Sequence, residues 1–421
     1  MKTVPYLLAI LWLAGSPLFA QPTLTPSKPE EAGFSADRLA RIDQTINHHL
    51  QEGHIPGAVV MIARNGKIIY HKAFGYADVD TKSPLKKDDI FRMASQSKAI
   101  TSLAAMMLWE ENKFGLDDPI SKYIPEFKNP RVMTRFNIAD STWSSEPAKS
   151  EPTIRQLLTH TSGIDYAGIG SQEFKAIYAK AGITSGIGGS NGPTIGEKMK
   201  KLGTLPLKHH PGERFTYGLN TDVLGYLIEV WSGKSFDEFL RTRIFQPLGM
   251  KDTHFYLPKE KHNRLVALHE FRDNKVTPVH HTIYDGFNPD YPKTENGTYF
   301  SGGAGLSGTI EDYAKFLQLF INGGTFNGTR LLSRKTVDLM LTNQMPDLSA
   351  SPFGLGFGLE TAKNDHLDPA SIGSFSWGGA FNTNYWGDQK EKIVALIYTN
   401  IYNARYGNMG FRQLVYQAIN D

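Results

Sequence analysis

Strand-like segments lie at both ends of this 421-residue chain, and a mostly helical stretch separates them. Near the N-terminus, the apolar run 57–64 is followed by Asn65-Gly66, a dipeptide typical of two-residue hairpin turns, and then by a second apolar segment, 67–74. Near the C-terminus, segments 380–387 and 392–399 flank a polar turn. This order predicts one antiparallel sheet built from both chain ends and flanked by helices, which is an α+β fold and not a βαβ repeat.

The helical patterns divide the chain into two expected domains. Ser35 can cap a helix that runs to about Gln51, because apolar residues recur there every three or four positions. Residues 153–158 and 220–232 are the clearest helices in the middle of the chain, and Ser235 can cap another over 236–245. We therefore expect a sheet domain formed by 21–94 and 296–421, and an inserted, mostly helical domain formed by 95–295. Within the latter, the composition of segment 168–203, rich in Gly, Ser and Lys, predicts a mobile insertion.

The first twenty residues differ from the rest of the chain. Lys2 precedes an apolar run from Val4 to Ala14, and a short stretch ending in Leu18-Phe19-Ala20 follows. This pattern is typical of a secretory signal peptide, and the apolar run is short for a membrane span. We expect residues 1–20 to be removed, no stable membrane span after that removal, and a periplasmic or secreted bacterial protein. A membrane anchor is the alternative interpretation of the same segment.

The composition argues against several classes of protein. The chain has no cysteine, which excludes disulfides, thiol catalysis and iron–sulfur ligation. The formal net charge is +3 without a dense basic stripe, so nucleic acid is not an expected partner. The 13 histidines are not accompanied by a His-Glu-x-x-His helix or by clustered carboxylates. We therefore expect no metal and no organic cofactor, whereas the oligomeric state is not predicted.

The pattern Ser95-x-x-Lys98 lies where an extended segment turns into a long apolar helix. At this spacing a serine hydroxyl and a lysine amine share one helix face, and a lysine held partly out of water can activate the serine as a nucleophile. The N–H of Ser95 would lie at a helix N-terminus, which favours a developing oxyanion. The alternative is a helix cap beside a surface lysine. A second copy, Ser83-x-x-Lys86, contains Pro84 and precedes charged residues, which indicates an exposed turn.

Two further segments carry groups that such a nucleophile requires. Tyr217 lies between the Pro211-Gly212 turn and the helix 220–232, and a phenolate beside an ammonium group can act as a general base. Trp377-Gly378-Gly379 leads into the strand expected at 380–387, where paired glycines let a substrate approach the backbone. The N–H of Ala380 is then a candidate second oxyanion donor, and Trp377 a candidate apolar wall. The alternatives are a packing tyrosine and a β-bulge with a packing tryptophan.

In this order, Ser95-x-x-Lys98, Tyr217 and Trp377-Gly378-Gly379 resemble the serine β-lactamase/penicillin-binding-protein superfamily. More narrowly, the chain resembles its class C β-lactamase-like branch, which includes the family VIII carboxylesterases. Segments 157–163, 246–250 and 302–306 also match that branch, so the resemblance extends from about Phe34 to the C-terminus. It implies a β-lactamase/transpeptidase-like fold, with Ser95 as nucleophile and Lys98 and Tyr217 as the base pair.

Two departures from the class C pattern bear on the substrate. Leu219 stands where class C β-lactamases have the asparagine of Tyr-x-Asn, and Trp377 stands where they have the lysine of Lys-Thr-Gly. That lysine would meet a substrate carboxylate, whereas a tryptophan favours neutral or apolar acyl groups. Trp-Gly-Gly is similar to the version in family VIII esterases, and it favours an ester over a lactam.

We therefore expect an exported serine hydrolase that acts on a small ester or amide through an acyl-enzyme, with a carboxylesterase as the first choice. A β-lactamase or a D-amino-acid peptidase is the alternative, and a non-catalytic, penicillin-binding-like sensor is another. A rival nucleophile motif, Gly188-x-Ser190-x-Gly192, has the Gly-x-Ser-x-Gly spacing of α/β-hydrolases. It lies in the Gly-rich insertion, without the buried strand that such a motif requires, and a plain loop is the favoured interpretation.

Overall fold

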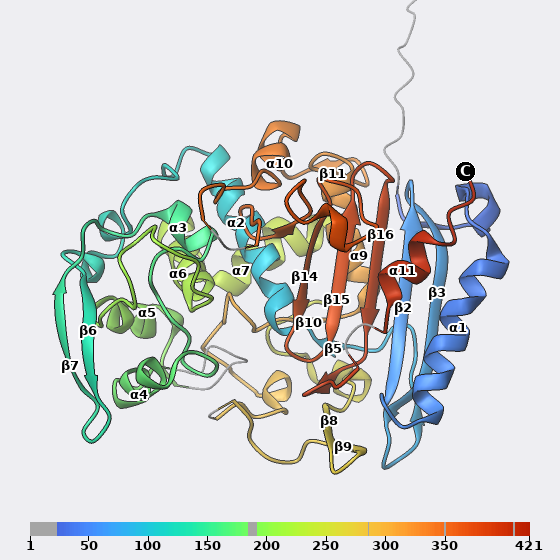
Figure 1. Cartoon of the computed structure of the whole chain (residues 1–421), viewed down its shortest axis with the longest axis horizontal. Coiled ribbons are helices and arrows are strands. Elements are labelled where there is room, and N and C mark those ends of the chain that lie inside the picture. Colours follow the sequence, from blue (N-terminus) through green and yellow to red (C-terminus); the bar gives the residue numbers. More distant parts are fainter. Residues whose placement is uncertain (1–22, 184–191, 285, 349–350, 407–408) are drawn as a thin grey trace, which may run out of the picture.

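The computed structural model describes residues 23–183, 192–284, 286–348, 351–406 and 409–421; the predicted signal peptide, 1–20, and Gly188–Asn191 of the rival motif lie outside them. The strands of the main sheet are β1 (Thr25–Pro26), β2 (Gly57–Arg64), β3 (Lys67–Asp78), β4 (Ser83–Pro84), β13 (Gly358–Leu359), β14 (Phe375–Gly379), β15 (Thr383–Asp388) and β16 (Ile393–Tyr398). They follow the order β1-β3-β2-β16-β15-β14-β13, and β4 pairs with β3. The β2–β16 pair is antiparallel, with Met61 opposite Leu396, and joins the two ends of the chain. The predicted α+β sheet built from both chain ends is confirmed (Figure 1).

Strand β2 is buried on both faces because helices cover both sides of the sheet. Val60 and Ile62 pack with α1 (Ala36–Gln51) and α11 (Phe411–Tyr416) in one core. Val59 and Met61 belong to the second core, which contains α2 (Ser97–Glu110) and α9 (Ile310–Ile321). The two-residue period of a strand sends alternate side chains to these two cores, and this explains why the segment is a continuous apolar run.

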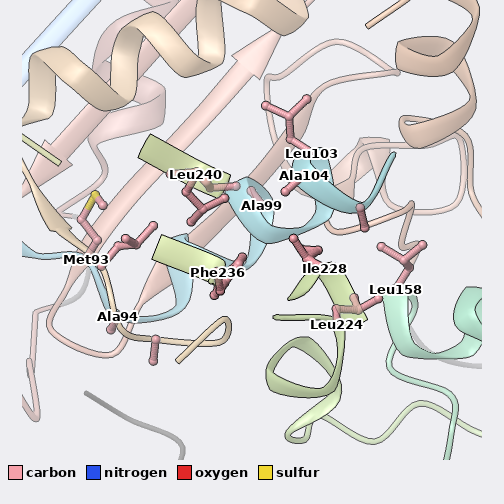
Figure 2. Close-up of a cluster of buried hydrophobic side chains, with 14 of the residues drawn as sticks. Met93, Ala94, Ala99, Leu103, Ala104, Leu158, Leu224, Ile228, Phe236 and Leu240 are labelled. Atoms are coloured by element: carbon pink, nitrogen blue, oxygen red, sulfur yellow. The ribbon is translucent and has the colours of Figure 1, made fainter. Parts of the chain in front are cut away.

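Helix α2 is the central element on the second face of the sheet. Every residue from Ser97 to Leu108 is buried, so the helix is surrounded by protein on all sides. Figure 2 shows its side chains among those of α3 (Ile154–Leu158), α6 (Asn220–Ser232) and α7 (Phe236–Leu240). The close packing fixes the N-terminal end of α2 between the sheet and the helical region.

The region expected to be mostly helical also contains two hairpins. They are β6 (Arg131–Asn137) with β7 (Thr142–Pro147), and β8 (His269–Arg272) with β9 (Lys275–Pro278). The segment 168–203, expected as an insertion, contains two helices, α4 (Gln172–Lys180) and α5 (Ile195–Gly203), and both bury an apolar face. Besides short 3-10 turns, the remaining elements are β5 (Phe91–Arg92) paired with β10 (Ser307–Gly308), β11 (Thr325–Phe326) paired with β12 (Thr329–Arg330), β17 (Ile401–Tyr402), a π-helical turn (Arg241–Phe245), α8 (Gln246–Leu248) and α10 (Arg334–Met340).

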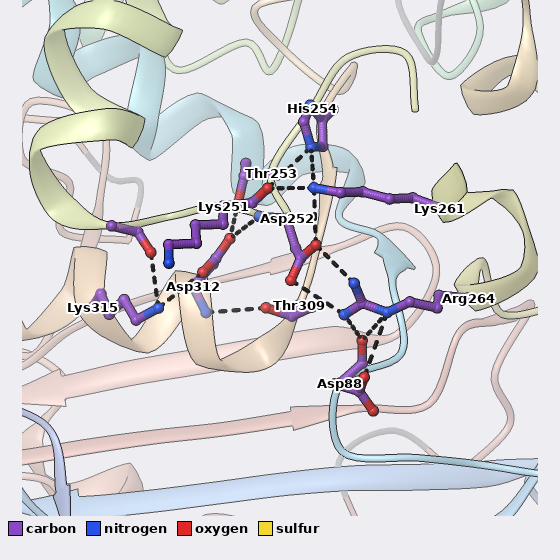
Figure 3. A network of polar contacts seen from close by, with 11 residues as sticks. Asp88, Lys251, Asp252, Thr253, His254, Lys261, Arg264, Thr309, Asp312 and Lys315 are labelled. Carbon is purple, nitrogen blue, oxygen red and sulfur yellow. Dashed lines mark hydrogen bonds and ion pairs between the residues drawn. The ribbon is translucent and has the colours of Figure 1, made fainter. Parts of the chain in front are cut away.

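A polar network ties the loop after α8 to the start of α9 (Figure 3). Asp312 is buried in the first turn of α9 and accepts hydrogen bonds from the Asp252 N–H at 2.7 Å and the Thr253 hydroxyl at 3.1 Å. Lys315 lies 3.1 Å from the same carboxylate, and Arg264 binds Asp252 at 2.8 Å. The network therefore fastens this loop against the helix that covers the sheet.

In the part of the chain that the structure describes, no helix combines the length and the apolar character that crossing a membrane requires.

Candidate active site

Ser95 lies in a short 3-10 turn, Ala94–Gln96, that leads directly into α2. Ala94 has a φ of 45°, which is uncommon for a residue other than glycine and is typical of strained turns at functional sites. The Ser97 hydroxyl fixes the turn, because it donates to the Ala94 carbonyl at 2.7 Å and accepts the Leu306 N–H at 3.0 Å. Ser95 itself is partly exposed and precedes the buried part of α2, Ser97–Leu108.

Lys98 follows one turn later and is 2% exposed. Its Nζ donates to the Ser95 Oγ at 3.2 Å, to the Tyr166 hydroxyl at 3.3 Å and to the Gly303 carbonyl at 2.8 Å. Three acceptors therefore surround the amine nitrogen of Lys98. The structure thus brings the predicted pair Ser95 and Lys98 into direct contact and adds Tyr166, which the sequence analysis did not single out.

The Gly302-Gly303 segment lets the backbone approach α6 closely enough to reach Lys98. A Cβ on Gly303 would lie 2.7 Å from Asp222 Oδ2, and one on Gly302 would lie 2.2 Å from the Thr221 carbonyl oxygen. No side chain fits at either position without a shift of the backbone or of the buried carboxylate. This explains the two glycines in a segment that the sequence analysis noted only as a family match.

Asp222 is a buried carboxylate next to Gly303, the residue whose carbonyl accepts a hydrogen bond from Lys98. It is 0% exposed and accepts a hydrogen bond from the Tyr299 hydroxyl at 3.2 Å. Burial raises the pKa of Asp222 to about 6, although hydrogen bonds from Ser301, Tyr299 and the Gly303 N–H and the charge of Lys98 all act to lower it. The carboxylate and the lysine thus act on each other across the Gly303 backbone.

Tyr217 reaches the site from the loop before α6. The Thr216 N–H donates to the His160 carbonyl at 2.7 Å and holds this loop in place. Lys98 Nζ lies 4.5 Å from the centroid of the Tyr217 ring, so the cation faces the ring. The Tyr217 hydroxyl accepts a hydrogen bond from Trp377 Nε1 at 3.4 Å. The structure therefore gathers Lys98, Tyr217 and Trp377 in one place.

The ring of His160 packs against the ring of Tyr217. It is 1% exposed, its ring centroid lies 4.8 Å from that of Tyr217, and its Nδ1 lies 3.0 Å from Asn220 Nδ2. The Asn220 amide donates, so Nδ1 is the acceptor. Burial and the charge of Lys98 hold the pKa of His160 well below its ordinary value, and the ring stays neutral. His160 is thus a structural hydrogen-bond partner.

Strand β14 brings Trp377, Gly378 and Gly379 beside the Ser95 turn. The predicted strand at 380–387 begins later, at Thr383, because 380–382 form the turn between β14 and β15 and Asn382 takes a positive φ of 56°. A Cβ on Gly379 would lie 2.3 Å from the Met93 carbonyl oxygen, which shows how closely the end of β14 approaches the segment before Ser95. Ala380 opens the turn, and its N–H donates no hydrogen bond to the described residues.

Tyr166 and Asp222 were not predicted from the sequence, because the sequence pattern around each of them is weak. Tyr166 follows the matched segment 157–163 by three positions, and one tyrosine among 18 has no distinguishing pattern. Asp222 is an ionisable residue in the largely apolar helix α6, and a charged residue on a buried helix face is a signal that could have found it.

No group of three or more His, Asp or Glu side chains in the described ranges is arranged to hold a metal ion.

The chain is similar in sequence to several known proteins. The family model described as Beta-lactamase matches residues 42–416. The chain is 31% identical over 404 residues to Esterase EstB of Burkholderia gladioli, with 90% of this chain and 95% of that protein covered. It is 32% identical over 359 residues to Protein Rv1367c of Mycobacterium tuberculosis, with 82% of this chain and 85% of that protein covered.

The chain is also similar to solved structures of the same fold. The structure of EstCE1, a hydrolase with promiscuous acyltransferase activity, matches with a TM-score of 0.76 and 29% identity over 90% of this chain and 99% of that one. Simvastatin synthase (LovD) of Aspergillus terreus matches with a TM-score of 0.74 over 92% of this chain and 98% of that one, and its 23% identity shows a likeness of fold alone.

Proposed function

This chain belongs to the beta-lactamase family and is a serine hydrolase, and we propose that it is a carboxylesterase that hydrolyses small esters through an acyl-enzyme. The observation that carries the proposal is the contact between Lys98 Nζ and Ser95 Oγ at 3.2 Å, with Trp377 beside Tyr217 where a lactamase of the class C pattern has a lysine.

In the acylation step, Ser95 Oγ attacks the ester carbonyl carbon and transfers its proton to the Lys98/Tyr217 pair. The charge that develops on the carbonyl oxygen is stabilised by the N–H groups of Ser95 and Ala380. The Ser95 amide is in the first turn of its helix, where N–H groups lack an intrahelical acceptor. The carbon–oxygen bond to the alcohol then breaks, and the alcohol leaves with the proton that the pair holds.

Deacylation repeats these steps with water as the nucleophile. The Lys98/Tyr217 pair takes a proton from water, the hydroxide attacks the acyl carbon, and Ser95 leaves with the returned proton. Lys98 has no carboxylate in direct contact in the described residues, and its partners are a serine, a tyrosine and a carbonyl. A proton can therefore leave its nitrogen without breaking an ion pair.

Trp377 supports an ester over a β-lactam as the substrate. Its ring packs edge-on against Phe353 with the centroids 5.2 Å apart, and its indole N–H is directed to Tyr217. An indole at this position presents an apolar face and no cation to a substrate carboxylate. The relatives named as an esterase and as a hydrolase with acyltransferase activity support the same choice.

The test compares the purified protein with its Ser95→Ala variant on p-nitrophenyl butyrate and on a chromogenic cephalosporin. We expect ester turnover that is lost in Ser95→Ala and little cephalosporin turnover. Faster cephalosporin turnover would contradict the role of Trp377. Ester turnover that survives in Ser95→Ala would contradict the nucleophile.

We also propose that the protein is exported, on the composition of residues 1–20. Fractionation of cells that express the full chain tests this proposal, and recovery of the uncut chain in the cytoplasm would contradict it.

A further inference from the structure

A cavity of about 460 Å³ lies at the outer edge of the sheet, where β13 and β14 pair. One part of its lining is aromatic and consists of Phe215, Phe353 and Trp377. Trp377 also donates to Tyr217 in the active site, so the cavity and the active site share this side chain. The other part of the lining is polar, and it contains a carboxylate that none of the steps described above uses.

That carboxylate belongs to Glu360, which is 8% exposed. Its Oε1 and the Oγ of its neighbour Ser374, which is 3% exposed, have no hydrogen-bond partner among the described residues. The two residues are side by side because the Glu360 N–H donates to the Ser374 carbonyl at 2.8 Å and so extends the pairing of β13 with β14. Buried polar groups are normally paired, and an unpaired carboxylate is among the costliest exceptions.

Among the described residues that line the cavity, Arg412 is the one cation, and it already has a carboxylate partner. Arg412 binds Asp368 at 2.7 Å, and both side chains are largely buried. Burial and the charges of Asp368 and Asp365 raise the pKa of Glu360, and Arg412 opposes that effect. Because Arg412 is paired with Asp368, an ionised Glu360 has no cationic partner of its own among the described residues that line the cavity.

We propose that this cavity is a subsite for a protonated primary amine on the substrate, bound by the Glu360 carboxylate and reached by an aliphatic chain that packs on Trp377. The proposal rests on the proposed esterase function and names its substrate class, an ester with an aminoalkyl group. An ammonium group supplies three N–H donors for the carboxylate and the neighbouring hydroxyl, and a cation is also attracted to the faces of aromatic rings. The methylene groups of the chain would remain on the aromatic side of the cavity.

The first experiment compares p-nitrophenyl 6-aminohexanoate with the neutral p-nitrophenyl heptanoate, which has nearly the same length. We expect the wild-type protein to show a higher kcat/KM for the amino ester. Glu360→Gln keeps the shape of the side chain and removes its charge, and it should lower the ratio of the two kcat/KM values about 10-fold. Glu52→Gln is the matched control, because Glu52 is exposed at the C-terminal end of α1 and does not line the cavity, and it should change the ratio less than twofold.

Equal kcat/KM values for the two esters in the wild-type protein, or a ratio that Glu360→Gln does not change, would overturn the subsite. Failure to turn over either ester would contradict the proposed function instead. A binding measurement keeps the two apart, because it needs no turnover. In Ser95→Ala, hexylammonium should raise the unfolding temperature more than hexanol at the same concentration, and the difference should vanish in Ser95→Ala/Glu360→Gln. No difference in Ser95→Ala would overturn the subsite whatever the esterase assay shows.

Discussion

At the scale of single residues, Lys98 contacts two tyrosines, one through its hydroxyl group and the other through the face of its ring. The Tyr166 hydroxyl accepts a hydrogen bond from Nζ, whereas Tyr217 faces Nζ with its ring. Burial, with the charges of Tyr217 and Asp222, raises the pKa of Tyr166 well above its ordinary value, so Tyr166 stays protonated and positions Lys98. The hydroxyl of Tyr217 is the one left for proton transfer.

A pair of Tyr→Phe variants separates these roles, because both keep the ring contacts. Tyr217→Phe should lower kcat/KM for p-nitrophenyl butyrate by about 10²- to 10⁴-fold, the usual loss of a general acid–base group. Tyr166→Phe removes one hydrogen bond to Lys98 and should lower it about 10-fold. Steady-state kinetics on both variants checks which loss in kcat/KM is larger. A larger loss in Tyr166→Phe would indicate that Tyr166, and not Tyr217, transfers the proton.

Asp222 makes the free energy of unfolding depend on pH. Its pKa in the folded state is raised to about 6, above the value in an unfolded chain, so the folded protein loses stability relative to the unfolded chain as pH rises from about 4 to about 6. Asp222→Asn cannot ionise and should escape this loss, which is about 3 kcal/mol for a shift of about two pKa units. Denaturant unfolding of both proteins at pH 4 and pH 7 measures it. A stability difference between the two proteins that is the same at both pH values would contradict the raised pKa.

At the scale of elements, the end of β14 must approach the Ser95 turn. A Cβ on Gly379 would lie 2.3 Å from both the Met93 carbonyl oxygen and Thr383 Oγ1, so Gly379→Ala should push β14 away and displace the Ala380 N–H. We expect a loss in kcat of about 10²- to 10³-fold, the usual effect of removing an oxyanion donor.

Gly378→Ala is the matched control for this prediction. Its Cβ would meet the end of the Asn384 side chain at 2.7 Å, which can turn aside more cheaply than backbone, and the nearest backbone atom, the Thr383 carbonyl oxygen, lies at 3.2 Å. We expect the kcat of Gly378→Ala to be within about 10-fold of wild type on the same ester. A Gly379→Ala variant as active as Gly378→Ala would remove the Ala380 N–H from the oxyanion site.

The elements that the sequence predicted are those whose signals are local. Helix α1 has a cap at Ser35 and a regular apolar face, and β2 ends at the Asn65-Gly66 turn, so their bounds could be predicted. The segments α4 and α5 are short amphipathic helices within a Gly-rich stretch. The composition of that stretch made the helical spacing of their apolar residues hard to recognise. The contacts of Tyr166 and Asp222 with the Lys98 site depend on how α2, α6 and the Gly302-Gly303 segment pack, which no local pattern encodes.

At the scale of the whole molecule, the network around Asp312 holds the loop after α8 against helix α9, which covers the sheet. Asp312→Ala leaves the Asp252 N–H and the Thr253 hydroxyl without their acceptor and Lys315 without its buried partner. We expect a loss of about 3 kcal/mol in the free energy of unfolding. Asp338→Ala breaks an exposed pair with Arg334 and should cost less than about 1 kcal/mol. Urea denaturation of both variants checks this, and equal losses would contradict a structural role for the network.

The site is assembled from distant parts of the chain: Ser95 and Lys98 at the start of α2, Tyr217 before α6, and Trp377 on β14. The sequence predicted these residues from their types and their order, and the resemblance to a family supplied the expectation that they meet. Their orientations could not be predicted, and the ring of Tyr217, not its hydroxyl, faces Lys98.

The central claim is that Ser95 forms an acyl-enzyme, and trapping that intermediate tests it most directly. The protein is mixed with p-nitrophenyl acetate, quenched in acid within the first turnover, digested, and analysed by mass spectrometry. We predict an acetyl group on Ser95 itself, located by fragmentation, and no acetylated peptide from Ser95→Ala. Acetylation at another residue, or hydrolysis by Ser95→Ala at the wild-type rate, would contradict the account.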